Sequence, residues 1–263
     1  MLNPVAVSRR ARSLLQTEAR RASARRIFSR YSQFTMIPRE TFVENILLCQ
    51  QWAASGCVVE CGVWRGGMSA GMADTLPGRS HFLFDSFEGL PPAREIDGPA
   101  ALAWQADVDA PGYRDNCSAE QTFSRTAMAM SRAASFELVQ GWFSDTLPGF
   151  RPPEPIGVLR LDADWYDSTM DCLVNLYPHV APRGLIILDD YHQWDGCSRA
   201  LRFPCRGEAN GAHMPVAGRR MLHAQEALTA AGVANRCARV YTSLKACAAD
   251  LTRRIRQHNG RVT

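Results

Sequence analysis

Two pairs of aspartates carry the strongest chemical signal in this sequence. Asp162 and Asp164 follow one apolar segment, and Asp189 and Asp190 follow the next. Consecutive segments of this kind usually become neighbouring parallel strands, so the four carboxylates would meet at one sheet edge. Like charges at ~4 Å repel by about 1–4 kcal/mol per pair, depending on the local dielectric. Either some of these acids are protonated or a divalent cation lies among them, and ligation by oxygen alone favours a hard ion such as Mg²⁺. The alternative is that one Asp caps the following helix and another is exposed.

A glycine-containing turn indicates a second ligand site. Glu60-x-Gly62-x-x-x-Gly66-Gly67 follows an apolar segment and precedes a predicted helix, so the backbone can approach a ligand at the helix N-terminus. This is not the G-x-G-x-x-G pattern of dinucleotide sites, and its acid would repel a pyrophosphate. An acid here suits a cationic group, such as the amino group of a methionine moiety. The alternative is a tight turn with a solvated Glu60.

Asp85 ends the next apolar segment. At a strand end, an aspartate can accept hydrogen bonds from the two hydroxyls of a ribose. Strand ends often carry Asp, so this residue is weak evidence alone. Together with the turn that contains Glu60, it outlines a nucleoside pocket.

The hydrophobic pattern predicts the scaffold that would position these residues. Apolar segments read as buried strands at 57–61, 81–84, 136–140, 157–161 and 185–188. They alternate with amphipathic helices, which predicts an α/β fold with a doubly wound, mostly parallel sheet. Ligands bind such sheets at the carboxyl ends of the strands, where every motif above lies.

Capping patterns and periodicity place the helices. A capping box from Thr41 to Glu44 predicts a helix over about 41–54, and the glycine turn is followed by a helix over about 68–76. A second capping-box pattern, Ser168 with Asp171, predicts another helix start. These helices would cover the sheet.

The rest of the chain flanks or interrupts this core, which we expect at 35–202. Residues 1–34 read as a basic helical extension. The long polar connection 91–131 is expected to be a lid or to be disordered. The atypical segment 203–263 is rich in Arg, Ala and Gly, is expected to be poorly ordered, and offers one plausible strand, residues 240–242. Either a divergent tail or a shifted reading frame in a GC-rich gene would explain it.

Composition argues against several classes of protein. The net charge is +7 over residues 1–30, −10 over 31–202 and +7 over 203–263, so the part that carries the motifs is acidic and a nucleic-acid partner is not expected. No apolar run of about 18 residues predicts a membrane span, and the N-terminus lacks the apolar core of a secretory signal. Nine cysteines without a CxxC pair suggest reduced, mostly buried thiols. We therefore expect a cytoplasmic protein that can form a homo-oligomer. The alternative for the Arg-rich N-terminus is an organellar presequence.

Aromatic and imidazole side chains near the strand ends are weaker candidates. Trp142, Trp165 and Trp194 lie just beyond strand ends and could wall a pocket, although each alone is more often a core residue. His179 and His192 read as loop or helix-face residues, because an oxygen cluster needs no imidazole. No set of Cys, His and Asn or of Ser, His and Asp has a spacing typical of a catalytic triad.

Five motifs in order give the chain a resemblance to a known family. They are Glu60-Cys-Gly-Val-Trp-Arg-Gly-Gly67, Phe84-Asp-Ser-Phe-Glu-Gly-Leu-Pro91, Gly141-Trp-Phe-Ser-Asp-Thr-Leu-Pro148, Leu161-Asp-Ala-Asp-Trp-Tyr-Asp-Ser-Thr169 and Leu188-Asp-Asp-Tyr191. Over about residues 35–202 they resemble the macrocin O-methyltransferase family of antibiotic-sugar methyltransferases. The resemblance implies a class I, Rossmann-like, S-adenosylmethionine-dependent methyltransferase fold, a divalent metal such as Mg²⁺, and a sugar hydroxyl as the acceptor.

The resemblance also implies roles for particular residues. It makes Asp162, Asp189 and Asp190 the metal ligands and Asp164 the general base. The residues implied to contact the cofactor are Glu60, Gly62, Trp64, Asp85 and Ser86, with Gly141 and Trp142 near its adenine. The segment 91–131 would be the family's mobile lid.

Two other functions are compatible with the sequence. Asp162-Ala163-Asp164 also spells the DxD motif of metal-dependent glycosyltransferases, although the turn at Glu60 and the second acid pair argue against it. The atypical C-terminal segment is compatible with an inactive, cofactor-binding or scaffolding protein.

Overall fold

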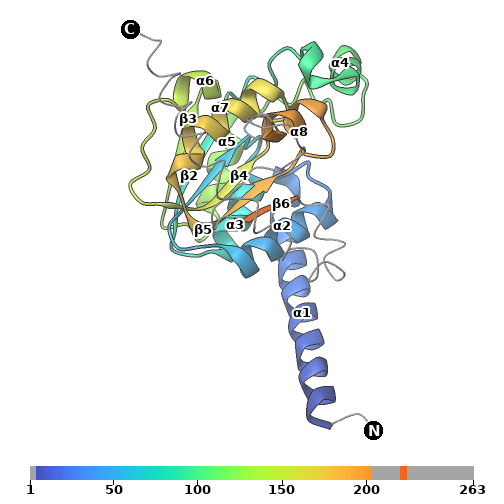
Figure 1. Cartoon of the computed structure of the whole chain (residues 1–263), viewed down its shortest axis with the longest axis vertical. Helices are drawn as coiled ribbons and strands as arrows, with labels where there is room; N and C mark the ends of the chain where they lie inside the picture. Colours follow the sequence, from blue (N-terminus) through green and yellow to red (C-terminus); the bar gives the residue numbers. More distant parts are fainter. Residues whose placement is uncertain (1–3, 203–219, 224–263) are drawn as a thin grey trace.

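The protein is built on one parallel β-sheet with helices on both faces (Figure 1). The computed structural model describes residues 4–202 and 220–223 of the 263-residue chain. Within that part, the strand order is β3-β2-β1-β4-β5-β6, and every neighbouring pair is parallel. The strands are β1 (Cys57–Cys61), β2 (Ser80–Asp85), β3 (Ser135–Gln140), β4 (Ile156–Leu161), β5 (Val180–Leu188) and β6 (Arg220–His223). The predicted α/β, doubly wound class is confirmed.

The helices fall in the connections between the strands. The α-helices are α1 (Pro4–Tyr31), α2 (Arg39–Trp52), α3 (Gly67–Thr75), α4 (Pro99–Ala106), α5 (Gln121–Ala129), α6 (Phe143–Thr146), α7 (Tyr166–Leu176) and α8 (Asp195–Arg202). Short 3-10 helices are η1 (Ser32–Phe34), η2 (Glu95–Asp97) and η3 (Tyr177–His179).

Alternate residues of the central strands face two separate cores. Val58 and Val158 pack with the buried faces of α1, α2 and α3. Val59 and Leu159 face the opposite way and pack with residues of α7 and α8. Because both faces are covered, β1 and β4 are buried along their whole length, which explains their nearly continuous apolar sequences.

The strand register brings the carboxyl ends together. Glu60 of β1 lies opposite Arg160 of β4, and Arg160 lies opposite Ile187 of β5. Just past the strands, the Asp162 amide donates to the Cys61 carbonyl over 2.9 Å, and the Asp189 amide donates to the Leu161 carbonyl over 3.0 Å. The acidic residues therefore emerge at one edge of the sheet, as the sequence predicted.

Both predicted capping boxes are wrong. Helix α2 begins at Arg39, after Pro38, and Glu44 is buried and pairs with Arg21 of α1 instead of capping the helix. Helix α7 begins at Tyr166, and its first amide donates to Asp97 of η2 over 2.7 Å. A distant acid thus provides the partner that the local pattern assigned to a neighbour.

Helix α1 extends away from the sheet (Figure 1). Its C-terminal part packs on the core, where Ala24 and Tyr31 are buried and the Tyr31 hydroxyl donates to Asp74 of α3 over 3.0 Å. Among the helices that the structure describes, none combines the length and apolar character needed to span a bilayer. The cysteines of the described part are free thiols, all buried except the half-buried Cys117.

The connection 91–131 is built from η2, α4 and α5 with turns between them. Strand β6 lies in the segment 203–263 and pairs with β5. The strand expected at residues 240–242 lies outside the described residues.

Candidate active site

A cavity of about 770 Å³ opens at the carboxyl ends of the strands. All eleven site residues singled out from the sequence line it: Glu60, Gly62, Trp64, Asp85, Ser86, Gly141, Trp142, Asp162, Asp164, Asp189 and Asp190. These residues come from five connections of the sheet, so the fold gathers at one place what the chain separates by up to 130 residues.

The turn after β1 is shaped by backbone packing. Gly62 has φ +84, and a Cβ there would lie 1.8 Å from the Asp162 carbonyl oxygen. Only glycine fits this close approach in the left-handed region. The turn therefore lies directly against the start of the acidic segment after β4.

Asp85 is tied to this same turn. One carboxylate oxygen accepts from the amides of Val63 (2.6 Å) and Trp64 (2.8 Å), and the other accepts from the Phe87 amide (2.7 Å). Burial raises the pKa of Asp85, and these three amide bonds oppose the rise. Since an ionised carboxylate offers about four acceptor positions, Asp85 can still accept a hydrogen bond from a ligand hydroxyl. The structure thus shows Asp85 ordering the turn, a role that the sequence did not predict.

Arg160 is a site residue that the sequence did not indicate. It is completely buried in β4, and its Nη1 lies 2.7 Å from Glu60 Oε1 and 3.0 Å from Asp162 Oδ2. Its Nη2 lies 2.9 Å from Asp189 Oδ2. An isolated Arg in an apolar strand gives no local signal, because its partners are on other strands.

Glu60 is completely buried beneath the cavity. Ser69 of α3 donates to its second oxygen. Burial raises the pKa of Glu60 to about 7, although Arg160 and Ser69 oppose the rise. Asn45 contacts Asp189 Oδ1 at 3.4 Å, so Asp189 is held from two sides.

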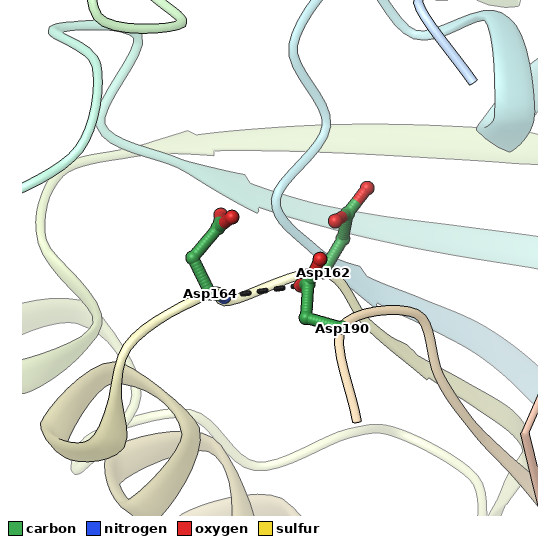
Figure 2. Close-up of side chains that lie close together, drawn as sticks. All are labelled: Asp162, Asp164 and Asp190. Atoms are coloured by element: carbon green, nitrogen blue, oxygen red, sulfur yellow. Dashed lines mark hydrogen bonds between the residues drawn. The ribbon is translucent and has the colours of Figure 1, made fainter. Parts of the chain in front are cut away.

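Three carboxylates form the closest acidic group (Figure 2). One oxygen each of Asp162, Asp164 and Asp190 lie within 4.8 Å of one another, and the Asp164 amide donates to Asp190 Oδ2 over 3.2 Å. Asp164 has φ 55, a left-handed conformation in which Asp is enriched. Figure 2 shows the Asp164 amide pointing at the Asp190 carboxylate. Asp189 is the one predicted ligand outside this group.

The acids repel one another because they are close and shielded from water. Burial and then Asp162 raise the pKa of Asp164 to about 8. Burial raises the pKa of Asp162 to about 6 despite Arg160, and burial with the neighbouring acids raises the pKa of Asp190 well above its usual range. One guanidinium therefore compensates only part of the acidic charge, which is the condition that a bound divalent cation relieves.

Tryptophans wall the acidic side of the cavity. Trp165 and Trp194 meet edge to face with ring centroids 5.3 Å apart, and the Trp194 indole donates to Asp164 Oδ1 over 3.0 Å. Trp142, Trp165 and Trp194 all line the cavity, as the sequence suggested. Trp104 of α4, which was not singled out, packs at 5.9 Å from Trp194 and lines the cavity too.

Two further segments close the cavity. Residues 34–38, between α1 and α2, line it, and no sequence pattern had indicated them. The connection 91–131 lines another side and is anchored to the turn after β1, since the Trp64 indole donates to the Ser118 carbonyl over 3.2 Å and Ser124 donates to the Trp64 carbonyl over 2.7 Å. His179 and His192 do not line the cavity.

Comparisons with known proteins agree with this architecture. The chain is 36% identical over 174 residues to the 8-demethyl-8-(2,3-dimethoxy-alpha-L-rhamnosyl)-tetracenomycin-C 4'-O-methyltransferase of Streptomyces olivaceus, an alignment that covers 60% of this chain and 63% of the relative. It is 32% identical over 181 residues to the demethyldecarbamoylnovobiocin O-methyltransferase of Streptomyces niveus, again with 60% and 63% covered. The chain thus spans less than two thirds of the length of these relatives.

A solved structure and a family profile complete the comparison. The structure of the O-methyltransferase NovP superposes with a TM-score of 0.51 at 30% identity and covers 66% of this chain and 74% of that one. Residues 32–210 match the profile described as macrocin-O-methyltransferase (TylF). The match spans more than half of the chain and includes all of the cavity residues singled out from the sequence, so this protein belongs to the macrocin O-methyltransferase family.

Proposed function

We propose that this chain is an S-adenosylmethionine-dependent O-methyltransferase that acts, with a divalent cation such as Mg²⁺, on a hydroxyl of a sugar moiety of a natural product. The observation that carries the proposal is the group of Asp162, Asp164 and Asp190 beside the turn at Gly62 in one cavity. The two curated relatives above carry O-methyltransferase names. Nothing in these comparisons favours a glycosyltransferase or an inactive protein.

The residues present fit a hard divalent cation. The donors at the acidic edge are carboxylate oxygens, which Mg²⁺ prefers. Asp162 places Oδ2 against Arg160 and keeps Oδ1 for a cation. Asp189 Oδ1 accepts from Asn45 over 3.4 Å and keeps a second lone pair for the cation. We assign Asp162, Asp189 and Asp190 as the ligands, and a cation held there would lower the pKa of a nearby acceptor hydroxyl.

The cavity also fits a nucleoside with a cationic amino acid end. Glu60 provides the acid for an amino group, and Asp85 and Ser86 line the wall where a ribose would lie. Gly141 and Trp142 line the neighbouring wall, which suits an adenine. When bound, S-adenosylmethionine supplies the methyl group as an electrophile.

Asp164 is suited to accept the proton of the acceptor hydroxyl. Its Oδ1 accepts from Trp194, which leaves the other oxygen for the proton. Burial and Asp162 raise its pKa to about 8, and a cation held by the neighbouring acids would lower that pKa, so that the carboxylate would be ionised and could take a proton near neutral pH. Trp104, Trp165 and Trp194 exclude water from this side of the cavity, where a sugar ring would lie.

Binding and transfer assays test the proposal. We expect S-adenosylmethionine, but not a nucleotide sugar, to raise the melting temperature of the full chain. We also expect tritiated methyl groups to appear on a member of a panel of glycosylated natural products, in a reaction that EDTA stops and Mg²⁺ restores. Stabilisation by a nucleotide sugar alone, or methyl transfer that survives chelation, would contradict it.

A further inference from the structure

Arg160 links three strands through one buried guanidinium. Glu60 lies in β1, Asp162 follows β4 and Asp189 follows β5. All three carboxylates lie within 3.0 Å of the terminal nitrogens of Arg160. The Arg160 side chain is 1% exposed and Glu60 is fully buried, whereas the Asp162 side chain is 28% exposed toward the cavity. The guanidinium therefore lies underneath the site and is shielded from solvent.

One nitrogen of Arg160 is shared by two of these acids. Arg160 Nη1 contacts Glu60 Oε1 at 2.7 Å and Asp162 Oδ2 at 3.0 Å, so a single atom spans the two acids. A guanidinium holds its donors in a rigid plane, whereas a lysine ammonium is a point charge on a flexible stem. Ser69 holds Glu60 from the other side, and the register of β1 with β4 limits movement between them.

We infer that Arg160 is a positioning residue that sets the separation between the cofactor end of the site, at Glu60, and the acidic end, at Asp162 and Asp190. The inference rests on the proposed function, in which Glu60 faces the methyl donor and the aspartates face the cation. Displacements of about 1 Å in such sites can lower turnover by about 10²-fold. Both terminal nitrogens of Arg160 pair with acids, so it would act through the acids that it holds.

The test measures this separation directly and needs no acceptor. Mn²⁺ is added to the full chain with S-adenosylmethionine that carries an isotope-labelled methyl group, and the paramagnetic relaxation of the methyl signal is recorded. That relaxation depends on the inverse sixth power of the distance between ion and methyl. The variant is Arg160→Lys. The matched control is Arg79→Lys, since Arg79 does not line the cavity and its guanidinium donates to the Ala54 carbonyl, before β1.

We expect Arg160→Lys to bind Mn²⁺ and S-adenosylmethionine within about tenfold of wild-type affinity, while a shift of about 1 Å changes the relaxation rate about twofold or more. Arg79→Lys should keep the wild-type relaxation rate. An unchanged rate in Arg160→Lys would overturn the inference, as would the loss of either ligand from a folded variant, which would show a binding role. If Arg160→Lys does not fold, Arg160→Gln replaces it, and failure of both would show that Arg160 only stabilises the fold. A wild-type chain that binds neither ligand would instead refute the proposed function.

Discussion

The indole N–H of Trp194 donates a hydrogen bond of 3.0 Å to Oδ1 of Asp164. Trp194 lies in the turn after β5, and Asp164 lies in the turn after β4, 30 residues earlier. The bond fixes the carboxylate that we propose as the base. It also opposes the rise of the Asp164 pKa that burial and Asp162 cause.

Replacing this indole tests the role of Asp164. In Trp194→Phe the carboxylate loses its fixed donor, so its pKa rises further and less of it is ionised near neutral pH. Because hydrogen bonds to charged groups contribute about 1.5–3 kcal/mol, we expect the turnover number to fall about tenfold or more. The acidic limb of the pH profile should move to higher pH. Trp165→Phe is the control, since that indole donates to the Pro91 carbonyl. Equal losses in both variants would contradict the prediction.

Calorimetry with Mn²⁺ separates ligand from base. We expect Asp162→Asn and Asp189→Asn to weaken Mn²⁺ binding, and excess Mg²⁺ to restore part of their activity, because the other oxygens of the site remain. Asp164→Asn should lower turnover by about 10²-fold or more and leave metal affinity nearly unchanged. The opposite pattern, with Asp164 needed for the ion and Asp189 dispensable, would move Asp164 into the ligand set. The closeness of Asp164 to Asp162 and Asp190 makes this measurement decisive.

A matched pair of glycines tests the close approach after β1. Gly62 and Gly78 have similar backbones, with φ +84 and +79, but only Gly62 has a backbone atom within reach of a Cβ. Gly78→Ala should lower the free energy of unfolding by about 1–2 kcal/mol, the usual cost of the left-handed region. Gly62→Ala should cost about 3 kcal/mol or more, because the clash with the Asp162 carbonyl adds to that strain. Urea unfolding of both variants measures the difference, and equal costs would show that the turn relaxes freely.

His81 makes stability depend on pH. It is fully buried in β2, and its ring nitrogens have no hydrogen-bond partner among the described residues. Burial, and then Arg79, lower its pKa from 6.5 to about 4. The unfolded chain therefore binds the proton first as pH falls. The contribution of neutral His81 to the free energy of unfolding is fully present above about pH 7. About 3 kcal/mol of that free energy is lost as pH falls from 6.5 to 4.

Substitution of His81 should remove that dependence. We expect the free energy of unfolding of His81→Leu to fall less than that of wild type over this range, as followed by urea unfolding at several pH values. His179→Leu is the control, because His179 is only partly buried and its substitution should leave most of the slope. If the free energy of unfolding of His81→Leu depended on pH as steeply as that of wild type, groups other than His81 would cause the pH dependence.

The sequence by itself determined the scaffold and the position of the chemistry. Buried strands need continuous apolar segments, and parallel strands place their carboxyl ends at one edge. That local rule was enough to bring Glu60, Asp85 and the four aspartates to one cavity wall before any contact was known. The family motifs then identified the class of site. Helix starts were harder, because the Thr41 and Ser168 patterns competed with the distant partners Arg21 and Asp97.

Tertiary structure alone decided which side chains meet. Arg160 reads as an anomaly in an apolar strand until β1 and β5 bring Glu60 and Asp189 to its guanidinium. Trp104 and the segment 34–38 become cavity walls only when distant helices pack. Asp164 lies near Asp162 and Asp190 in a segment held by contacts with Asp190 and Trp194, which follow another strand. The physical reason is common to all of them: charge pairing and close packing depend on separation in space, which a sequence pattern does not contain.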